Sequence, residues 1–262
     1  MKLIGKGRTA DVYYHEGKAI KVFSNDISDE WVAYEYKVNE IASKSLGPKV
    51  YSMDKLDDKK AISFEYIDGE LLSEHFKNHM SRCRSLGKVF GTLHYRMHQN
   101  KADELIDQKT YFSNQLKKIK ILDEDIKERL LNHLDTLEDG HALCHGDYHI
   151  ENIIISDTWR IIDWTNAYSG NPLSDVARTY MILKSPYVKT FVPWYLRGGL
   201  NTVVSMFTMH YFRSYRKESD ITFKKMRVWL PIIYACRLNE NIKEEKSWLL
   251  SQLLYEMNKQ KI

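Results

Sequence analysis

The residues that most constrain the fold of this 262-residue chain lie near its middle, in the sequence HALCHGDYHIENIIISDTWRIID. Within it, His145 and Asp147 are followed by Asn152 in the pattern H-x-D-x-x-x-x-N. In such a loop the aspartate can accept a proton from an attacking hydroxyl group, and the asparagine can hold a magnesium ion. The spacing is therefore typical of a phosphoryl-transfer site.

A β-hairpin is expected directly after this loop. The turn residues Ser156–Thr158 separate two apolar runs, Ile153–Ile155 and Trp159–Ile162, which is typical of two short antiparallel strands. The hairpin would bring Asp163 back beside Asn152. Two oxygen ligands so placed suit Mg²⁺, which prefers hard oxygen donors and keeps substrate phosphates in its remaining positions.

A rival interpretation is a zinc site made by four nearby residues: His141, Cys144, His145 and His149. Their spacing would align three imidazoles on one face only if the segment were a helix. Gly146 disfavours a helix here, and the run from Ile150 to Ile155 is typical of a strand. The sequence therefore favours phosphoryl transfer, with His149 as a loop-packing residue or one near the phosphates.

The N-terminus supplies a candidate phosphate loop. Residues 5–12 follow the pattern G-x-G-x-x-A-x-V, with Gly5 and Gly7 at the first two marked positions and Ala10 at the third. Glycine lets backbone N–H groups approach phosphate oxygens closely. A dinucleotide-binding loop would need a helix straight after it. The residues on either side of Gly17 instead predict a β-hairpin.

A candidate lysine for the nucleotide phosphates follows at Lys21, which ends an Ala-Ile-Lys motif; Lys18 is the nearby alternative. Residues 29–45 then predict a helix with an apolar stripe formed by Trp31, Tyr34, Val38, Ile41 and Ala42. Glu35 lies on the flank of that stripe, and is better placed than the other glutamates of the helix to hold the lysine by an ion pair. An ordinary exposed helix glutamate is the alternative.

These motifs resemble the aminoglycoside phosphotransferase and choline kinase family, small-molecule relatives of protein kinases. Three motifs match in order: His145-Gly146-Asp147 with Asn152, then Ile162-Asp163-Trp164, then Gly170-Asn171-Pro172-Leu173-Ser174-Asp175. The resemblance implies that Asp147 is the catalytic aspartate and that Asn152 and Asp163 are metal ligands. It also implies that His145 braces the loop and that Asp175 is structural.

The resemblance implies a fold and an activity as well. Glu65, Tyr66 and Ile67 resemble the family's hinge, whose backbone groups receive the purine base. The expected fold is α+β and protein-kinase-like, with a small antiparallel-sheet N-lobe at residues 1–68 and a mainly helical C-lobe at residues 69–262. The implied enzyme transfers the γ-phosphoryl group of ATP or GTP, with Mg²⁺, to a hydroxyl group of an aminoglycoside-like, choline-like or sugar-like molecule.

Two other classes of protein remain open. A protein kinase would carry D-F-G, an activation segment and A-P-E. Here Trp164 follows Asp163, and only Thr165 to Asn171 precede the next expected helix, which leaves little chain to bind a peptide. A nucleotide-binding regulatory pseudokinase is disfavoured because the candidate lysine, aspartates and asparagine are all present.

The acceptor would be selected by helices expected at about 171–183, 193–215, 221–239 and 243–258. They carry aromatic and polar candidates: Trp194, Tyr195, Tyr211, Phe212, Tyr215, Trp229, Tyr234, Asn239, Glu240, Glu244 and Glu245. Aromatic faces and carboxylates suit a cationic amine. Aromatic residues at helical spacing are more often core, however, and Glu244-Glu245 more often a solvated face. A cationic acceptor is therefore only modestly favoured over a sugar or other alcohol.

Charge and composition agree with a cytoplasmic enzyme. A net charge of +4, from 39 basic and 35 acidic residues that are scattered along the chain, indicates neither a nucleic-acid nor a membrane partner. No apolar run is long enough to span a bilayer, and the glycine loop begins too early to leave room for a signal peptide. The three cysteines are expected to be reduced core thiols.

Overall fold

The computed structural model describes residues 1–7, 9–187 and 197–262. The chain divides into two compact units. The first contains Met1–His75 and Ile150–Ala167, and the second contains Phe76–His149 and Tyr168–Ile262. The hairpin that follows the H-x-D loop therefore groups with the N-terminal residues, whereas a lobe boundary after residue 68 stays a prediction.

The first unit is built on a five-stranded antiparallel sheet with the strand order β1-β2-β3-β5-β4. The strands are β1 (Lys2–Lys6), β2 (Ala10–His15), β3 (Lys18–Phe23), β4 (Val50–Leu56) and β5 (Lys59–Glu65). The turns of two hairpins have positive φ angles, at Glu16 and Gly17 and at Asp57 and Asp58. Such turns match the right-handed twist of the strands that they join, so both hairpins form from local sequence.

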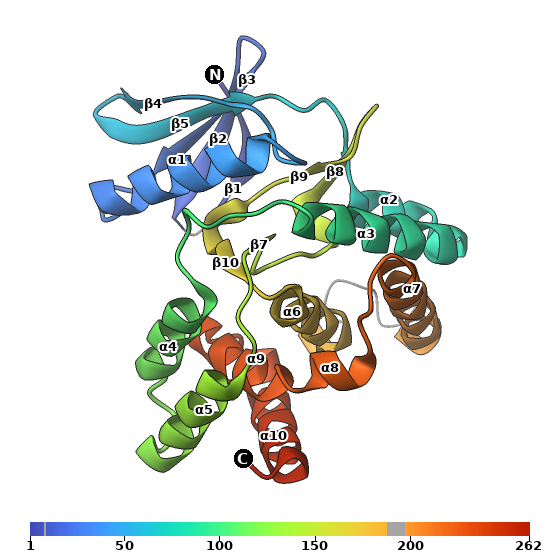
Figure 1. Ribbon diagram of the computed structural model, residues 1–262. Coiled ribbons are helices and arrows are strands. Elements are labelled where there is room, and N and C mark those ends of the chain that lie inside the picture. Colours follow the sequence, from blue (N-terminus) through green and yellow to red (C-terminus); the bar gives the residue numbers. More distant parts are fainter. Residues whose placement is uncertain (8, 188–196) are drawn as a thin grey trace. The chain divides into compact units, whose positions relative to one another are not determined.

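One helix, α1 (Asp29–Ser43), lies along this sheet (Figure 1). Ser28 caps it, because its hydroxyl oxygen accepts a hydrogen bond from the backbone N–H of Trp31. Val32 and Val38 are buried on the helix side that also buries Glu35. Trp31 is exposed, so its place in the predicted stripe was wrong: the buried face of the helix begins one residue further on, at Val32.

A second, three-stranded sheet completes the first unit, in the order β6 (Glu70–Leu71), β8 (Ile153–Ile155) and β9 (Arg160–Ile161). The pairing of β8 with β9 confirms the predicted hairpin. The strand expected from Ile150 begins only at Ile153, because residues 150–152 form a 3₁₀ turn. A side chain at Gly69 would stand 2.3 Å from the carbonyl oxygen of Ile155, so the close approach of β6 to β8 requires glycine.

The second unit is mainly helical, and the chain enters it within α2 (Leu72–Asn78). Its helices are α3 (Cys83–His98), α4 (Gln108–Lys118), α5 (Glu124–Thr136), α6 (Pro172–Lys184), α7 (Arg197–Lys217), α8 (Phe223–Arg227), α9 (Leu230–Arg237) and α10 (Lys243–Gln260). A two-stranded sheet joins β7 (Ala142–Cys144) to β10 (Tyr168–Gly170). The two paired strands flank residues 145–167 in the sequence, of which Ile150–Ala167 belong to the first unit.

Helices α3 and α7 pack closely along their lengths. A Cβ atom at Gly87 would lie 2.5 Å from the carbonyl oxygen of Phe207, and one at Gly91 would lie 2.4 Å from that of Tyr211. Two glycines four residues apart on one helix face therefore bring the two backbones together. Large side chains fill the core around this contact: Phe90, Met97, Tyr148, Phe207, Tyr211 and Tyr215.

Two of the expected C-terminal helices differ from the structure. The helix expected at 221–239 is split into α8 and α9. Pro231 stands in the first turn of α9, where its missing N–H group costs nothing, but it cannot continue a preceding helix. The expected start at Pro193, with Trp194 and Tyr195, lies outside the described residues. No helix in the described ranges is both long and apolar enough to cross a membrane.

Candidate functional site

In the first unit, Lys21 of β3 forms an ion pair with Glu35 of α1, with 2.5 Å between Nζ and Oε1. Its Nζ also lies 3.5 Å from an Oδ1 oxygen of Asp163 and donates a hydrogen bond to the hydroxyl of Thr165 at 3.3 Å. Glu35 is buried. The structure thus brings together three residues that the sequence singled out separately. Lys18, the alternative lysine, is exposed.

Burial and charge act in opposite directions on the pKa of Lys21. Burial disfavours the ammonium group, but the carboxylates of Glu35 and Asp163 outweigh it and raise the pKa above its ordinary value. The lysine is therefore a fixed positive charge at neutral pH, held by a buried partner on one side and facing a second carboxylate on the other.

The two candidate metal ligands, Asn152 and Asp163, also lie in the first unit. The backbone N–H of Ile162 donates to the carbonyl oxygen of Asn152 at 2.9 Å, which aligns the two segments just before Asp163. Asp163 adopts a left-handed conformation with φ of 60°, and its Oδ1 accepts a hydrogen bond from Thr165 at 2.8 Å. An amide and a carboxylate offer hard oxygen donors, so this pair fits a magnesium ion.

The candidate phosphate loop connects β1 to β2. The N–H of Gly7 donates to the carbonyl oxygen of Ala10 at 2.9 Å, and a Cβ at Gly7 would stand 2.8 Å from that oxygen. The tight turn therefore requires glycine at position 7. A Cβ at Gly5 would make only an ordinary contact with Val12, so packing does not explain glycine there. Arg8, inside the loop, lies outside the described residues.

The candidate hinge residues begin with Glu65, the last residue of β5. The carboxylate of Glu65 accepts a hydrogen bond from the backbone N–H of Lys49 at 3.1 Å. Tyr66 packs edge-on against Tyr14, with 4.6 Å between ring centroids, and Ile67 is half-buried. That the backbone of these residues binds the nucleotide base stays a prediction.

In the second unit, the carboxylate of Asp147 is held from two sides. Arg178 of α6 donates from Nη2 to Oδ1 at 3.2 Å, and the Nε2 of His149 lies 3.2 Å from Oδ2. Burial favours the neutral acid, but His149 and Arg178 outweigh it and hold the pKa of Asp147 well below its usual range. Asp147 is therefore ionised at neutral pH and can accept a proton.

Asp175 fixes the backbone of the loop that carries Asp147. Its Oδ2 accepts from the backbone N–H of His145 at 2.7 Å, and its Oδ1 accepts from that of Gly146 at 2.9 Å. Gly146 has a φ of 74°, a conformation that favours glycine. The ring of His145 in turn accepts the backbone N–H of Asp147 at 3.2 Å. These contacts agree with the bracing role expected for His145 and the structural role expected for Asp175.

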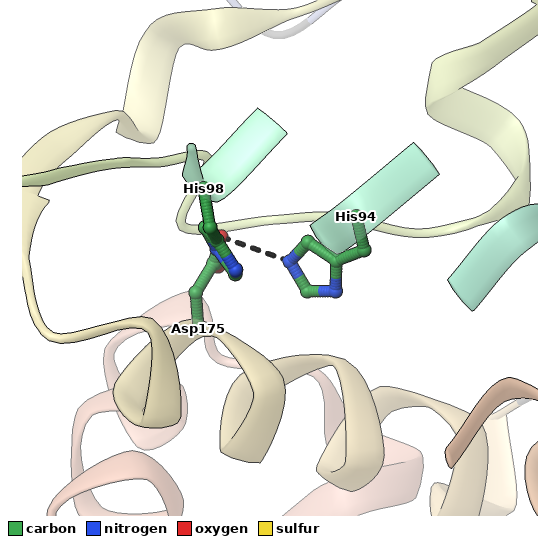
Figure 2. A group of neighbouring side chains, drawn as sticks. All are labelled: His94, His98 and Asp175. Carbon is green, nitrogen blue, oxygen red and sulfur yellow. Dashed lines mark hydrogen bonds and ion pairs between the residues drawn. The ribbon is translucent and has the colours of Figure 1, made fainter. Parts of the chain in front are cut away.

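Two buried histidines of α3 meet the same aspartate (Figure 2). The Nε2 atoms of His94 and His98 each lie 3.2 Å from Oδ2 of Asp175. Their Nδ1 atoms face the hydroxyl groups of Tyr211 at 2.8 Å and Tyr215 at 2.6 Å. Neutral rings that donate from Nε2 and accept at Nδ1 satisfy every one of these groups.

Among the described residues, those three side chains are the one cluster with the ligand types and spacing of a metal site. Because the neutral rings already complete its hydrogen bonding, we interpret the cluster as structural. The zinc site considered from sequence is not formed. His141 is exposed and pairs with Asp103, whereas Cys144 is buried and His149 contacts Asp147.

Comparison with known proteins places the chain among phosphotransferases. Residues 1–213 match the sequence profile of the phosphotransferase enzyme family, APH, which is well over half of the chain. The chain belongs to this family. No curated protein sequence gives a significant match.

Solved structures share the fold of this phosphotransferase. A choline/ethanolamine kinase family protein from Mesorhizobium loti has a TM-score of 0.61 and 15% identity, covering 97% of this chain and 86% of its own. A thermostable mutant of the aminoglycoside phosphotransferase APH(4)-Ia, in apo form, has a TM-score of 0.63 and 12% identity, covering 98% and 93%. A mutant of the same enzyme in ternary complex with AMP-PNP and hygromycin B has a TM-score of 0.54 and 11% identity, covering 98% and 92%. The expected protein-kinase-like fold is confirmed.

Several charged residues near Asp147 were missed or misread in the sequence. Arg178 was not singled out, although it stands one helical turn after Asp175. Glu245 was expected on a solvated face, but it is buried and receives two hydrogen bonds from Arg237. Glu240 also pairs with both arginines. Most of the aromatic candidates, Tyr211, Tyr215, Trp229 and Tyr234, are core residues.

Proposed function

We propose that this phosphotransferase moves the γ-phosphoryl group of ATP or GTP to a hydroxyl group of a small molecule. The observation that carries the proposal is the network of Lys21, Glu35 and Asp163 in the first unit, formed from three segments far apart in the sequence. A charged lysine held between a buried glutamate and a second carboxylate is the arrangement that kinase-type sites use to receive nucleotide phosphates.

In this proposal the first unit binds the nucleotide. Lys21 contacts its phosphates, the turn at Gly5 and Gly7 covers them with backbone N–H groups, and the backbone of Glu65, Tyr66 and Ile67 receives the base. Asn152 and Asp163 would hold Mg²⁺, which supplies charge neutralisation between the phosphate oxygens when bound. Because hinge recognition uses backbone groups, the side chains of these residues do not distinguish ATP from GTP.

Asp147 acts on the acceptor. Its ionised carboxylate accepts the proton of the acceptor hydroxyl as the hydroxyl oxygen forms a bond with the γ-phosphorus atom. The bond from that phosphorus to the bridging oxygen breaks, and the nucleoside diphosphate leaves with the electron pair. Lys21 offsets the charge that develops on the phosphate oxygens.

A small-molecule acceptor is supported by the short connection after Asp163. It forms a 3₁₀ turn and the strand β10 before α6 begins at Pro172, which leaves no long segment to bind a peptide. Two fold relatives, an aminoglycoside phosphotransferase in complex with hygromycin B and a choline/ethanolamine kinase family protein, agree with acceptors of this size. Glu240 and Glu245 do not favour a cationic acceptor over a sugar, since arginines already neutralise them.

A coupled nucleotide-consumption assay tests the proposal. Purified protein with Mg²⁺ and ATP or GTP is offered amines, aminoglycosides, choline-like alcohols, sugars and nucleosides, with Asp147→Asn as the matched control. We expect consumption that depends on one acceptor class and falls by several orders of magnitude in the control. Nucleotide binding without acceptor-dependent consumption across the panel would instead support a regulatory, non-catalytic protein.

A further inference from the structure

The second unit contains a chain of alternating charges that ends at the proposed catalytic carboxylate. In order, its members are Asp147, Arg178, Glu240, Arg237 and Glu245. They come from the catalytic loop, α6, the 3₁₀ turn Leu238–Glu240, α9 and α10. Ser185, just after α6, donates a hydrogen bond to Glu245 at the far end. Four separate elements are thus connected to Asp147 by ion pairs.

Arg178 is the link that touches Asp147. One nitrogen, Nη2, donates both to Oδ1 of Asp147 and to Oε1 of Glu240. The arginine is 9% exposed, and its Nε has no hydrogen-bond partner among the described residues. Because a guanidinium group stays charged at all ordinary pH values, this contact does not come and go with protonation of the arginine.

The two oxygens of Asp147 therefore differ. Oδ1 faces a permanent cation that is itself held by Glu240, and Glu240 is held on its other oxygen by Arg237 at 2.5 Å. Oδ2 faces the ring of His149 at 3.2 Å, a partner on the same loop whose hydrogen bond depends on its tautomer. A permanently charged partner on one oxygen and an imidazole on the other give the two oxygens of this carboxylate different surroundings.

We propose, on the basis of the proposed function above, that Arg178 is a positioning residue for Asp147. It holds Oδ1, so that Oδ2 is presented to the acceptor hydroxyl, and Glu240 keeps the guanidinium group at the distance that this requires. The long chain of ion pairs through Arg237 and Glu245 fixes the far side of Glu240 to α9 and α10.

This role has a signature in the pH dependence of turnover. Among the described residues, the titratable and charged groups that act on Asp147 include His149 on its own loop, Arg178 on α6, Arg237 on α9 and Tyr111 on α4, together with Glu240 beside Arg178. Removing the positive charge of Arg178 raises the pKa of Asp147. Since the ionised form is the base, the acid limb of the kcat profile then moves to higher pH.

Arg178→Met is the decisive variant, with Arg178→Lys as the conservative one. We expect Arg178→Met to lower kcat by about 10- to 100-fold, as misplacement of a catalytic group does, with little change in KM for the nucleotide and an acid limb at higher pH. Arg178→Lys keeps the charge but cannot present the same planar fork, and should recover part of kcat and most of the pH profile. Glu240→Gln should lower kcat less than Arg178→Met.

Arg227→Met is the matched control. Arg227 makes a bidentate ion pair with Glu256 in the same unit, and no contact within the described ranges joins it to the chain of charges that ends at Asp147. We expect this variant to lose thermal stability while keeping the wild-type kcat and pH profile. If Arg178→Met and Arg227→Met changed only stability, and both kept kcat and the acid limb, the positioning role would be overturned.

A double-mutant cycle separates this inference from the proposed function. Thermal unfolding of Asp147→Asn, Arg178→Met and the double variant measures their coupling without any turnover. Non-additive shifts in Tm are expected, and additive shifts would overturn the contact on which the inference depends. Wild-type protein that turns over no acceptor would refute the proposed function itself, whereas active wild-type protein with an unaffected Arg178→Met variant would refute the inference alone.

Discussion

Acidification should destabilise this protein through His94. The ring is fully buried, stacks on Tyr148 with 4.0 Å between centroids, and lies between Asp175 and the hydroxyl of Tyr211. Burial, with the nearby His98, lowers the pKa of His94 from 6.5 to about 3. In the unfolded chain the histidine binds a proton below pH 6.5, whereas in the folded protein it stays neutral until about pH 3.

The sign of the effect follows from this difference. Between those two pH values the unfolded state binds more protons, so the free energy of unfolding falls as the pH falls. At pH 5, about 1.5 units below the pKa of the unfolded histidine, His94 alone lowers the free energy of unfolding by about 2 kcal/mol, because each unit corresponds to about 1.4 kcal/mol. Below about pH 4, protonation of unfolded Asp175, whose native pKa is held low, adds a further loss.

The assay is urea unfolding at pH 7.5, 6 and 5, followed by tryptophan fluorescence, for wild type and His94→Gln. Glutamine can still donate to Asp175 but does not titrate, so the variant should start less stable and lose about 2 kcal/mol less between pH 7.5 and 5. His141→Gln, which removes an exposed histidine of the same unit, is the control and should follow the wild type. Equal pH dependence in wild type and His94→Gln would refute the argument.

Four further substitutions test packing and nucleotide binding. In thermal unfolding, Gly91→Ala should destabilise the protein by about 1–3 kcal/mol, because its Cβ meets the backbone of α7. Gly199→Ala is the control: a Cβ at this position of α7 meets open space, so the change should be neutral or stabilising by up to about 1 kcal/mol. Lys21→Met should lower kcat by about 100-fold, the usual loss when one charge-stabilising donor is removed. Asp163→Asn should weaken Mg²⁺-dependent nucleotide binding, measured by calorimetry, with less effect on binding without Mg²⁺.

For each of these predictions, one result would contradict the expected effect of the substitution. Equal stability of Gly91→Ala and Gly199→Ala would show that α7 can move away from α3 at no cost. Full turnover in Lys21→Met would remove the lysine from the phosphate site. Unchanged Mg²⁺ dependence in Asp163→Asn would mean that the metal, if it binds, uses other ligands.

The candidate residues of the first unit were predictable because each is fixed by local pattern. Lys21 was predicted from the Ala-Ile-Lys motif in a strand that follows a two-residue turn, and Glu35 from its place on the flank of the apolar stripe of a capped helix. The exposed Trp31 shows the limit of this reasoning. A helix face can be judged from spacing only to within about one residue when large apolar side chains stand at its border.

The charges around Asp147 were not predictable in the same way. Arg178 is 31 residues from Asp147 and 62 from Glu240 in the sequence, and only the packing of α6 beside α9 brings them together. The spacing of residues along one helix does not predict an ion pair between distant segments. Glu245 is buried, yet its neighbours in the sequence are those of an ordinary exposed helix glutamate. Partner choice among distant charges depends on tertiary packing, which composition and spacing do not contain.

The central claim is that Asp147 drives phosphoryl transfer to a small-molecule hydroxyl. Its most direct test is single-turnover transfer of the γ-phosphoryl group from labelled nucleotide to the acceptor found in the panel, for wild type and Asp147→Asn, with nucleotide affinity measured in parallel. We predict a phosphorylated acceptor with wild type, almost none with Asp147→Asn, and similar nucleotide affinities. Equal product from both proteins, or label released only as inorganic phosphate, would contradict the account.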